Sequence, residues 1–423
     1  MNFFFKVLVA TLFLILVYIF YRSEIDWGGY KRDIYLIYLI GTCLAIFFLI
    51  IFKFLNIKIQ KYIIIIFISI IFTLYTFEGK LTFDEKKTHL NYNLREVYED
   101  LKKTNLNVTV TAPPLNFLTF NELELLSLAG ISKAKTFFFC KENGYYPIYQ
   151  SDRYGFNNPD TEWDSKDIEY LLVGDSFTHG SCVNRPNDIA SVLRQYSKKN
   201  VLNLGQGGNG PLIEYATLRE YLAPNIKNVL WLYYEGNDLS DLEKELKNNI
   251  LNKYLTNQKF KQDLKLKQTQ INQFLTAFVE RVKVREIERE SIHNSKIITF
   301  IKLQNIRNLL IIPPEPPPPP PPPPELKIIL NLANELVESY NGKLYFIYLP
   351  TFERYTKWLK MDFKQKQQIK KIVTDLGIEF IDIDEEVFKK EKNPLKLFPF
   401  EQNGHYTVEG YKKVAVKIYE KTK

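Results

Sequence analysis

The chain has 423 residues, of which 46% are hydrophobic and 15% aromatic, enough for about two to three domains with packed cores. Its formal net charge of +8 is modest for this length, and no compact cluster of Lys and Arg is interleaved with aromatic residues, which argues against binding of nucleic acid. The three cysteines form no CxxC pair and the four histidines are scattered, so the ligand spacing of a zinc site is missing.

Residues 1–79 contain three long apolar segments, at 3–21, 34–52 and 62–77. About 20 apolar residues cross the hydrocarbon core of a bilayer, so the first two segments are long enough and the third is slightly short. The first segment ends in bulky aromatic residues without a small-x-small cleavage pattern, which favours a retained helix over a signal peptide. We therefore predict a membrane anchor of about three transmembrane helices embedded in the lipid bilayer. The basic residues of the two loops nearly balance and do not orient it.

Residues 80–164 are rich in turn-forming residues and tyrosine, which predicts a linker and a lead-in region of short strands and loops. Cys140 in this region and Cys182 further along allow two interpretations. They form one disulfide if their domain faces an oxidising compartment, or they are two buried free thiols.

From residue 165 to the end, short apolar strands alternate with helical segments, which indicates βαβ units and a parallel sheet. The predicted strands are 168–174, 200–205, 228–234, 342–350 and 378–383. At about 239–325 an insertion interrupts this alternation. It contains a charged helical segment with apolar residues at helical spacing and nine consecutive prolines, 316–324. The prolines predict a stiff polyproline II rod, either a spacer or a ligand for an SH3-like partner.

Chemically capable residues follow the predicted strands at the edge of the sheet where open α/β folds bind their ligands. They are Gly174, Asp175 and Ser176, then Gly205, Gly207, Gly208 and Asn209, then Gly236, Asn237 and Asp238, and finally Asn403, Gly404 and His405 before the last helix. A hydroxyl, flexible backbone amides, a side-chain amide and an imidazole are the groups that acyl transfer through a serine requires. Each has a structural alternative, since Ser176 could cap a helix, Asn237 could close a turn and His405 could lie in a surface loop.

With these residues the chain resembles the SGNH (GDSL-type) hydrolases over about residues 165–423. The motifs that match the family, in order, are GDSFTHG, NLGQGGNGP, EGND and NGHYTVEG. The resemblance implies a three-layer, flavodoxin-like α/β fold and no metal or organic cofactor. It implies that Ser176 is the nucleophile and His405 the base, with an oxyanion hole formed by the backbone N–H groups of Ser176 and Gly208 and the side-chain amide of Asn237.

The sequence departs from the family pattern at two places. Glu235 occupies a position that is usually glycine, and Gln402 and Asn403 stand where an aspartate often precedes the histidine. Three explanations remain for the second departure. Glu401 supplies the carboxylate, the enzyme works as a Ser-His dyad with a neutral partner such as Asn403 or a backbone carbonyl, or the site is weakened. His179 is a competing base on the helix after the serine.

Resemblance and anchor together predict a membrane-anchored serine esterase or O-acyltransferase. Membrane-bound relatives act on acetyl esters of cell-surface glycans, so the expected substrate is an acyl ester of such a glycan and the expected position of the catalytic domain is extracytoplasmic, in the periplasm. Two alternatives belong to other classes: a catalytically inactive scaffold or glycan-binding protein, and an interaction protein recruited through its prolines.

Overall fold

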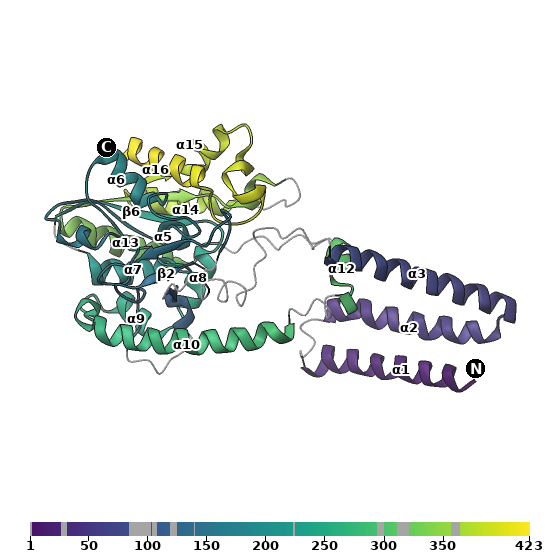
Figure 1. Cartoon of the computed structure of the whole chain (residues 1–423). Helices are drawn as coiled ribbons and strands as arrows, with labels where there is room; N and C mark the ends of the chain where they lie inside the picture. Colours follow the sequence, from purple (N-terminus) through teal and green to yellow (C-terminus); the bar gives the residue numbers. More distant parts are fainter. Residues whose placement is uncertain are drawn as a thin grey trace. The chain divides into compact units, whose positions relative to one another are not determined.

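The computed structural model of the chain describes residues 2–26, 32–83, 103, 108–118, 125–138, 140–222, 225–293, 300–310, 321–356 and 364–423. The chain divides into two compact units (Figure 1). The first consists of Met1–Asp84 and Lys296–Leu310, and the second of Glu85–Ser295 and Ile311–Lys423. Each unit is therefore built from two separate segments of the polypeptide.

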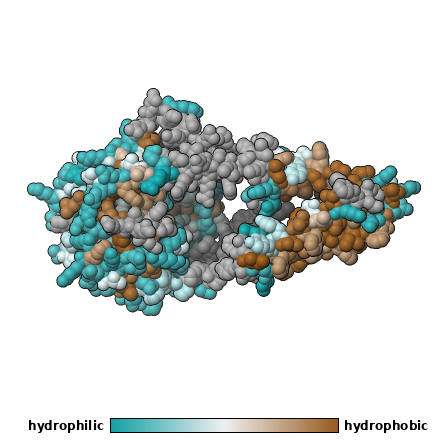
Figure 2. Space-filling view, turned by 90° about the horizontal axis from the view of Figure 1, so that it is seen from below, coloured by the Kyte–Doolittle hydropathy of each residue, from teal (hydrophilic) through white to brown (hydrophobic). Residues whose placement is uncertain are grey.

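Three long apolar helices form most of the first unit: α1 (Asn2–Tyr21), α2 (Arg32–Phe54) and α3 (Ile57–Phe83). Each is long and apolar enough to cross a membrane, over Phe5–Ile25, Tyr35–Phe54 and Ile57–Thr82. Large apolar side chains are exposed along all three helices, and Figure 2 shows them as a brown surface. Such a surface suits lipid, because a helix satisfies its own backbone hydrogen bonds in the absence of water.

The short helix α12 (Gln304–Leu310) packs against the end of α3. The fully buried carboxylate of Glu78 accepts the backbone N–H groups of Asn305 and Ile306 at 3.0 and 2.9 Å. It thereby satisfies donors at the start of α12 and places a negative charge at the positive end of that helix. The sequence analysis placed residues 304–310 inside the insertion of the catalytic domain, and the structure assigns them to the first unit.

A parallel sheet with the strand order β5-β4-β6-β7-β8 forms the centre of the second unit. Its strands are β4 (Ile168–Gly174), β5 (Val201–Asn203), β6 (Ile226–Tyr234), β7 (Lys343–Leu349) and β8 (Glu379–Asp382). Counted along the chain, the order is 2-1-3-4-5, which is that of flavodoxin-like folds. The predicted α/β fold class is confirmed.

Helices cover both faces of this sheet. On one face lie α7 (Pro211–Tyr221), α13 (Pro324–Ser339) and α14 (Lys364–Asp375), and on the other lie α6 (Ile189–Ser197) and α16 (Val408–Thr422). Successive side chains of a strand point to opposite faces, so Leu171 and Val173 join the first core while Tyr170 and Leu172 join the second. Burial on both faces explains why the strands read as continuous apolar runs.

A second, small sheet lies in the lead-in region, with β1 (Thr109–Val110), β2 (Lys135–Phe137) and β3 (Ile148–Gln150) in that order. Phe117, Leu126 and Phe137 of this region are buried in the same core as α7 and α13. Gln262 also binds the backbone N–H and C=O of Leu126, at 2.8 and 3.1 Å. The described part of the lead-in region is therefore packed against the α/β layers.

The insertion begins with α8 (Asp238–Glu245) and α9 (Asn249–Thr256) and continues with the long helix α10 (Gln268–His293). Ile271 of α10 is buried, and Phe274 and Phe278 pack edge-on against Phe117 of the lead-in region. Of the proline run, Pro316–Pro320 lie outside the described residues. Pro323, just before α13, has φ −64° and ψ 150°, close to polyproline II geometry.

Candidate active site

Ser176 is the first residue of the short helix α5 (Ser176–His179), directly after the carboxyl end of β4. The residue that caps this helix is Asp175, whose side chain accepts the backbone N–H of Phe177 at 2.9 Å. The turn leaves no room at Gly174, where a Cβ atom would lie 2.0 Å from the Thr178 hydroxyl. Ser176 therefore lies at the edge of the sheet, and its side chain does not cap the helix.

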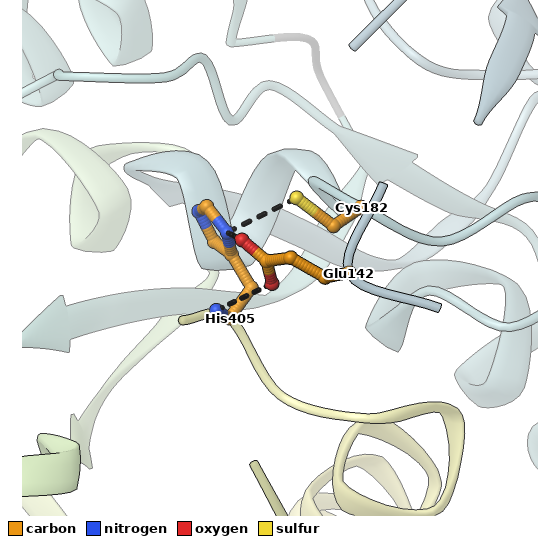
Figure 3. A group of neighbouring side chains, drawn as sticks. All are labelled: Glu142, Cys182 and His405. Atoms are coloured by element: carbon orange, nitrogen blue, oxygen red, sulfur yellow. Dashed lines mark hydrogen bonds and ion pairs between the residues drawn. The ribbon is translucent and has the colours of Figure 1, made fainter. Parts of the chain in front are cut away.

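The imidazole of His405 links Ser176 to a carboxylate. Its Nε2 lies 3.0 Å from Oγ of Ser176, and its Nδ1 lies 3.0 Å from Oε1 of Glu142. The second oxygen of Glu142 accepts the backbone N–H of His405 at 2.7 Å, as Figure 3 shows. A carboxylate on Nδ1 keeps the proton on that nitrogen and leaves Nε2 free to accept the proton of the serine. The geometry is that of a Ser-His-Glu triad.

Glu142 was missed by the sequence analysis. It lies in the loop between β2 and β3 of the lead-in region, 263 residues before His405, and it belongs to none of the motifs. The signal that could have found it is the pair of cysteines. Cys140 and Cys182 form a disulfide, with their Cα atoms 5.6 Å apart, and this bond joins the segment of Glu142 to the loop that follows α5.

Asn403 and Glu401, the two side chains considered as partners of His405, bind other residues. Asn403 donates to Oε1 of Glu353 at 2.7 Å, and Glu401 accepts the side-chain amide of Asn393 at 3.2 Å. Glu401 has a positive φ of 56°, as does its neighbour Phe400 with 55°, so the chain turns sharply just before His405. With the carboxylate supplied by Glu142, no acidic residue is needed at position 403.

The expected oxyanion donors lie in the loops after β5 and β6. A Cβ atom on Gly207 would lie 3.9 Å from Cβ of Ser176, so the loop that carries Gly208 borders the serine. Gly208 has φ +71°, a left-handed conformation that glycine adopts without strain. Asn237 is the N-cap residue of α8, and its side-chain amide donates to Asp241 at 2.6 Å.

Burial and charge act in opposite directions on the histidine. Burial lowers the pKa of His405, but the hydrogen bond and charge of Glu142, together with the charge of Asp175, raise it above its ordinary value. Folding therefore favours the imidazolium form. This contribution to stability is present below the pKa of an unfolded histidine, about 6.5, and is lost as the pH rises through the folded pKa.

His179, the competing base, is buried in an aromatic environment. Its Nε2 lies 3.1 Å from the hydroxyl of Tyr149, and its ring packs edge-on against Phe138. Burial, and to a smaller extent the charge of His405, lower the pKa of His179 to about 3. The side chain of His179 contacts Tyr149, whereas His405 is the histidine that contacts Ser176.

The unexpected Glu235 anchors a neighbouring loop. Its carboxylate accepts the hydroxyl of Tyr348 at 2.5 Å, the backbone N–H of Thr351 at 2.8 Å and Nε of Arg354 at 2.8 Å. A glycine at this position could make none of these bonds. The substitution thus connects the end of β6 to the loop after β7.

One group of side chains has the spacing of metal ligands. Potential ligand atoms of Glu142, Cys182 and His405 lie within 4.8 Å of one another (Figure 3). The sulfur of Cys182 is covalently bonded to Cys140, however, and the carboxylate and the imidazole are hydrogen-bonded to each other. This donor set does not fit a metal while the disulfide is formed, because the thiolate is the form of cysteine that binds metals.

We expect Glu142→Gln to lower the pKa of His405, because burial is then opposed only by the charge of Asp175. The shift can be followed by NMR titration of the full-length protein in detergent with ¹⁵N-labelled histidine, since the chain has only four histidines. Glu401→Gln is the matched control and should leave this pKa unchanged. A larger shift for Glu401→Gln than for Glu142→Gln would overturn the assignment of the carboxylate.

No protein-family model matches the sequence, and no curated protein matches it significantly. Among solved structures, a protein of the lipolytic G-D-S-L family from Desulfitobacterium hafniense is 15% identical, with a TM-score of 0.32, over 60% of this chain and 99% of that chain. A lipolytic G-D-S-L protein from Veillonella parvula is 13% identical, with a TM-score of 0.32, over 60% and 97%. A protein from Bacillus subtilis is 10% identical, with a TM-score of 0.33, over 60% and 56%.

Proposed function

We propose that this protein is a membrane-anchored SGNH-type enzyme, a serine esterase or O-acyltransferase. The observation that carries the proposal is the line of contacts from the Ser176 hydroxyl through both ring nitrogens of His405 to the Glu142 carboxylate. The motifs that resemble the SGNH hydrolases, and the carboxyl-end position of the serine in a flavodoxin-like sheet, support the same function.

In the first half of the reaction His405 acts as the base. Its Nε2 takes the proton of Ser176 while Oγ forms a bond to the acyl carbon of the ester. The tetrahedral intermediate collapses when the bond to the alkoxide leaving group breaks and His405 returns the proton to that oxygen. Glu142 stabilises the imidazolium that exists between these two events. The acyl group then forms an ester with Ser176.

In the second half another hydroxyl attacks the acyl-serine, and His405 acts as base and acid in the same way. If water attacks, the enzyme is an esterase. If a sugar hydroxyl attacks, it is an O-acyltransferase. Both share the same covalent intermediate, so a single set of residues serves either reaction.

The oxyanion is assigned to the backbone N–H groups of Ser176 and Gly208 and to the side chain of Asn237. An amide nitrogen carries two hydrogens, and the bond to Asp241 occupies one of them. The second is available for the oxyanion, and Asp241 fixes the orientation of the group. Donors held in place before the reaction stabilise the developing charge without reorganising.

The substrate is proposed to be an acyl ester, most simply an acetyl ester, of a cell-surface glycan. The three apolar helices support a position at the membrane. The Cys140–Cys182 disulfide supports an oxidising compartment, because such bonds persist outside the cytoplasm. The catalytic unit is therefore proposed to lie in the periplasm. Glu142 fills the role of the missing aspartate, which was the main support for an inactive scaffold.

A fluorophosphonate probe tests the nucleophile. We expect the full-length protein in detergent to be labelled at Ser176, as mapped by mass spectrometry, because His405 activates this hydroxyl. Labelling should rise with pH as the imidazole loses its proton, and Ser176→Ala and His405→Ala should abolish it. Ser339→Ala, an exposed serine at the end of α13, is the control and should label normally. If folded wild-type protein stays unlabelled, the proposed enzymatic function is refuted.

Asn237→Ala should reduce turnover of an acetyl ester such as p-nitrophenyl acetate by about 10²–10³-fold, the loss expected for one oxyanion donor. The thermal unfolding midpoint should change little, because the lost hydrogen bond lies at the start of one helix. Ser240→Ala removes a neighbouring hydroxyl that bonds the backbone of Asn237, and should leave turnover nearly unchanged. Equal losses for the two variants would argue against a specific role for the amide.

The orientation is tested by fusing a reporter after Lys423. We expect alkaline phosphatase, which needs disulfides to fold, to be active there, and a cytoplasm-dependent fluorescent protein to be dark. A fusion of the same reporters after Phe54 supplies the internal comparison, since it ends after two of the three helices. The reverse pattern at Lys423 would place the catalytic unit in the cytoplasm.

A further inference from the structure

The disulfide lies in direct contact with the catalytic histidine. Cys182 Sγ is 3.2 Å from Nδ1 of His405, the nitrogen that also contacts Glu142 (Figure 3). On the other side of the disulfide, Cys140 precedes Glu142 by two residues. The covalent bond therefore connects the segment of the triad carboxylate to the loop after α5, within reach of the ring that the carboxylate binds.

Besides the disulfide, hydrogen bonds and aromatic packing attach the segment around Glu142 to the site. It lies in the loop that connects β2 to β3, and the bonds of this loop are mostly internal, such as those from Phe138 N–H to Pro147 and from Gly144 N–H to Lys141. Two bonds cross to the loop after α5: the hydroxyl of Tyr145 accepts the backbone N–H of Asn184 at 3.5 Å, and Asn143 donates to the backbone carbonyl of Cys182 at 2.9 Å. That acceptor is the same residue that carries the disulfide. Without the covalent bond, the loop would be held by these hydrogen bonds and by the packing of Phe138 against His179.

The carboxylate of Glu142 fits into a narrow space beside the backbone before His405. A Cβ atom on Gly404 would lie 3.0 Å from Oε2 of Glu142, so the carboxylate approaches the backbone before His405 as closely as packing allows. A catalytic group displaced by about 1 Å can cost on the order of 10²-fold in rate. We expect the loop to sample such displacements without its cross-link, because chain entropy favours the many open conformations.

We propose that the Cys140–Cys182 disulfide is a positioning element of the active site, which holds Glu142 on His405 and makes activity depend on the oxidised state. The proposal rests on the function proposed above. Reduction by a dithiol transfers two electrons and two protons to the bond, yields the thiols of Cys140 and Cys182, and leaves the dithiol as its own disulfide. Glu142 is then free to leave the ring, and the enzyme behaves as a Ser-His dyad.

The proposal predicts a specific change at the histidine as well as a loss of rate. The titratable groups around His405 are Glu142 from the loop between β2 and β3, Asp175 and His179 from the turn and helix after β4, and, after reduction, the thiols. Released Glu142 no longer favours the imidazolium, so the pKa of His405 falls as it does in Glu142→Gln. A purely structural disulfide would lower stability without this shift.

The experiment compares wild type, Cys140→Ala, Cys140→Ala/Cys182→Ala and Glu142→Gln as full-length proteins in detergent. Wild type is also reduced after folding, so the result does not depend on variants that fold poorly. A chelator is present, because the freed thiol, Glu142 and His405 lie close enough to bind a metal. Cys43→Ala is the control, since Cys43 is the exposed free cysteine among the described residues and lies on α2.

We expect the double alanine variant and the reduced wild type to lose on the order of 10²-fold in fluorophosphonate labelling rate, while Cys43→Ala keeps the wild-type rate. Adding Glu142→Gln to the double variant should cost almost nothing further, since both changes remove the same interaction. The pKa of His405 should fall in all of these except Cys43→Ala.

An unchanged pKa of His405 in folded, disulfide-free protein would overturn the inference, because Glu142 would then stay in place without the bond. The titration of His405 does not require the protein to be active. If the oxidised wild type is not labelled at Ser176, the proposed function fails, yet the titration still decides whether the disulfide positions Glu142. If the wild type is labelled and the disulfide-free protein is labelled at the same rate, the proposed function stands and the positioning role fails.

Discussion

The bond between the Glu142 carboxylate and the His405 imidazole is the interaction on which the site depends. Burial alone would disfavour a charge on this ring, and a serine nucleophile needs a base that becomes charged during the reaction. The carboxylate selects the tautomer through Nδ1 and orients the ring through the backbone N–H of His405. Because Glu142 comes from the loop between β2 and β3, the small sheet of the lead-in region is a structural part of the site.

A chain of polar contacts connects the other loops at the same edge of the sheet. Glu235 binds Thr351, the hydroxyl of Thr351 donates to Glu353, and Glu353 accepts the amide of Asn403, two residues before His405. The two departures from the SGNH pattern, at Glu235 and Asn403, are thus the two ends of one network. The ion pair of Glu235 with Arg354 is largely buried, with side chains 7% and 9% exposed, so removing Arg354 would leave the charge of Glu235 uncompensated.

The sheet and the proximity of Ser176 and His405 at its edge could be predicted from the sequence because their signals are local. Each strand is a short apolar run, and Ser176 and His405 lie within motifs of a few residues. Glu142 could not be predicted in this way, since its partner lies 263 residues away and nothing near it in sequence indicates a catalytic role. The contact of Glu78 with α12 likewise joins residues 227 and 228 apart. Such pairings arise only when the whole chain folds.

The packing of α12 on α3 has a consequence for how the second unit could be separated from the three apolar helices. The polypeptide passes between the two units three times, near residues 84, 295 and 310. A protease that cuts near residue 295 or 310 leaves a covalent connection intact, and the β-sheet, built from strands on both sides of these cuts, keeps the fragments together. A cut near residue 84 still leaves α12 bound to α3 through the buried Glu78. Single cleavage events therefore keep the second unit attached to the three apolar helices, and its release requires at least one further break.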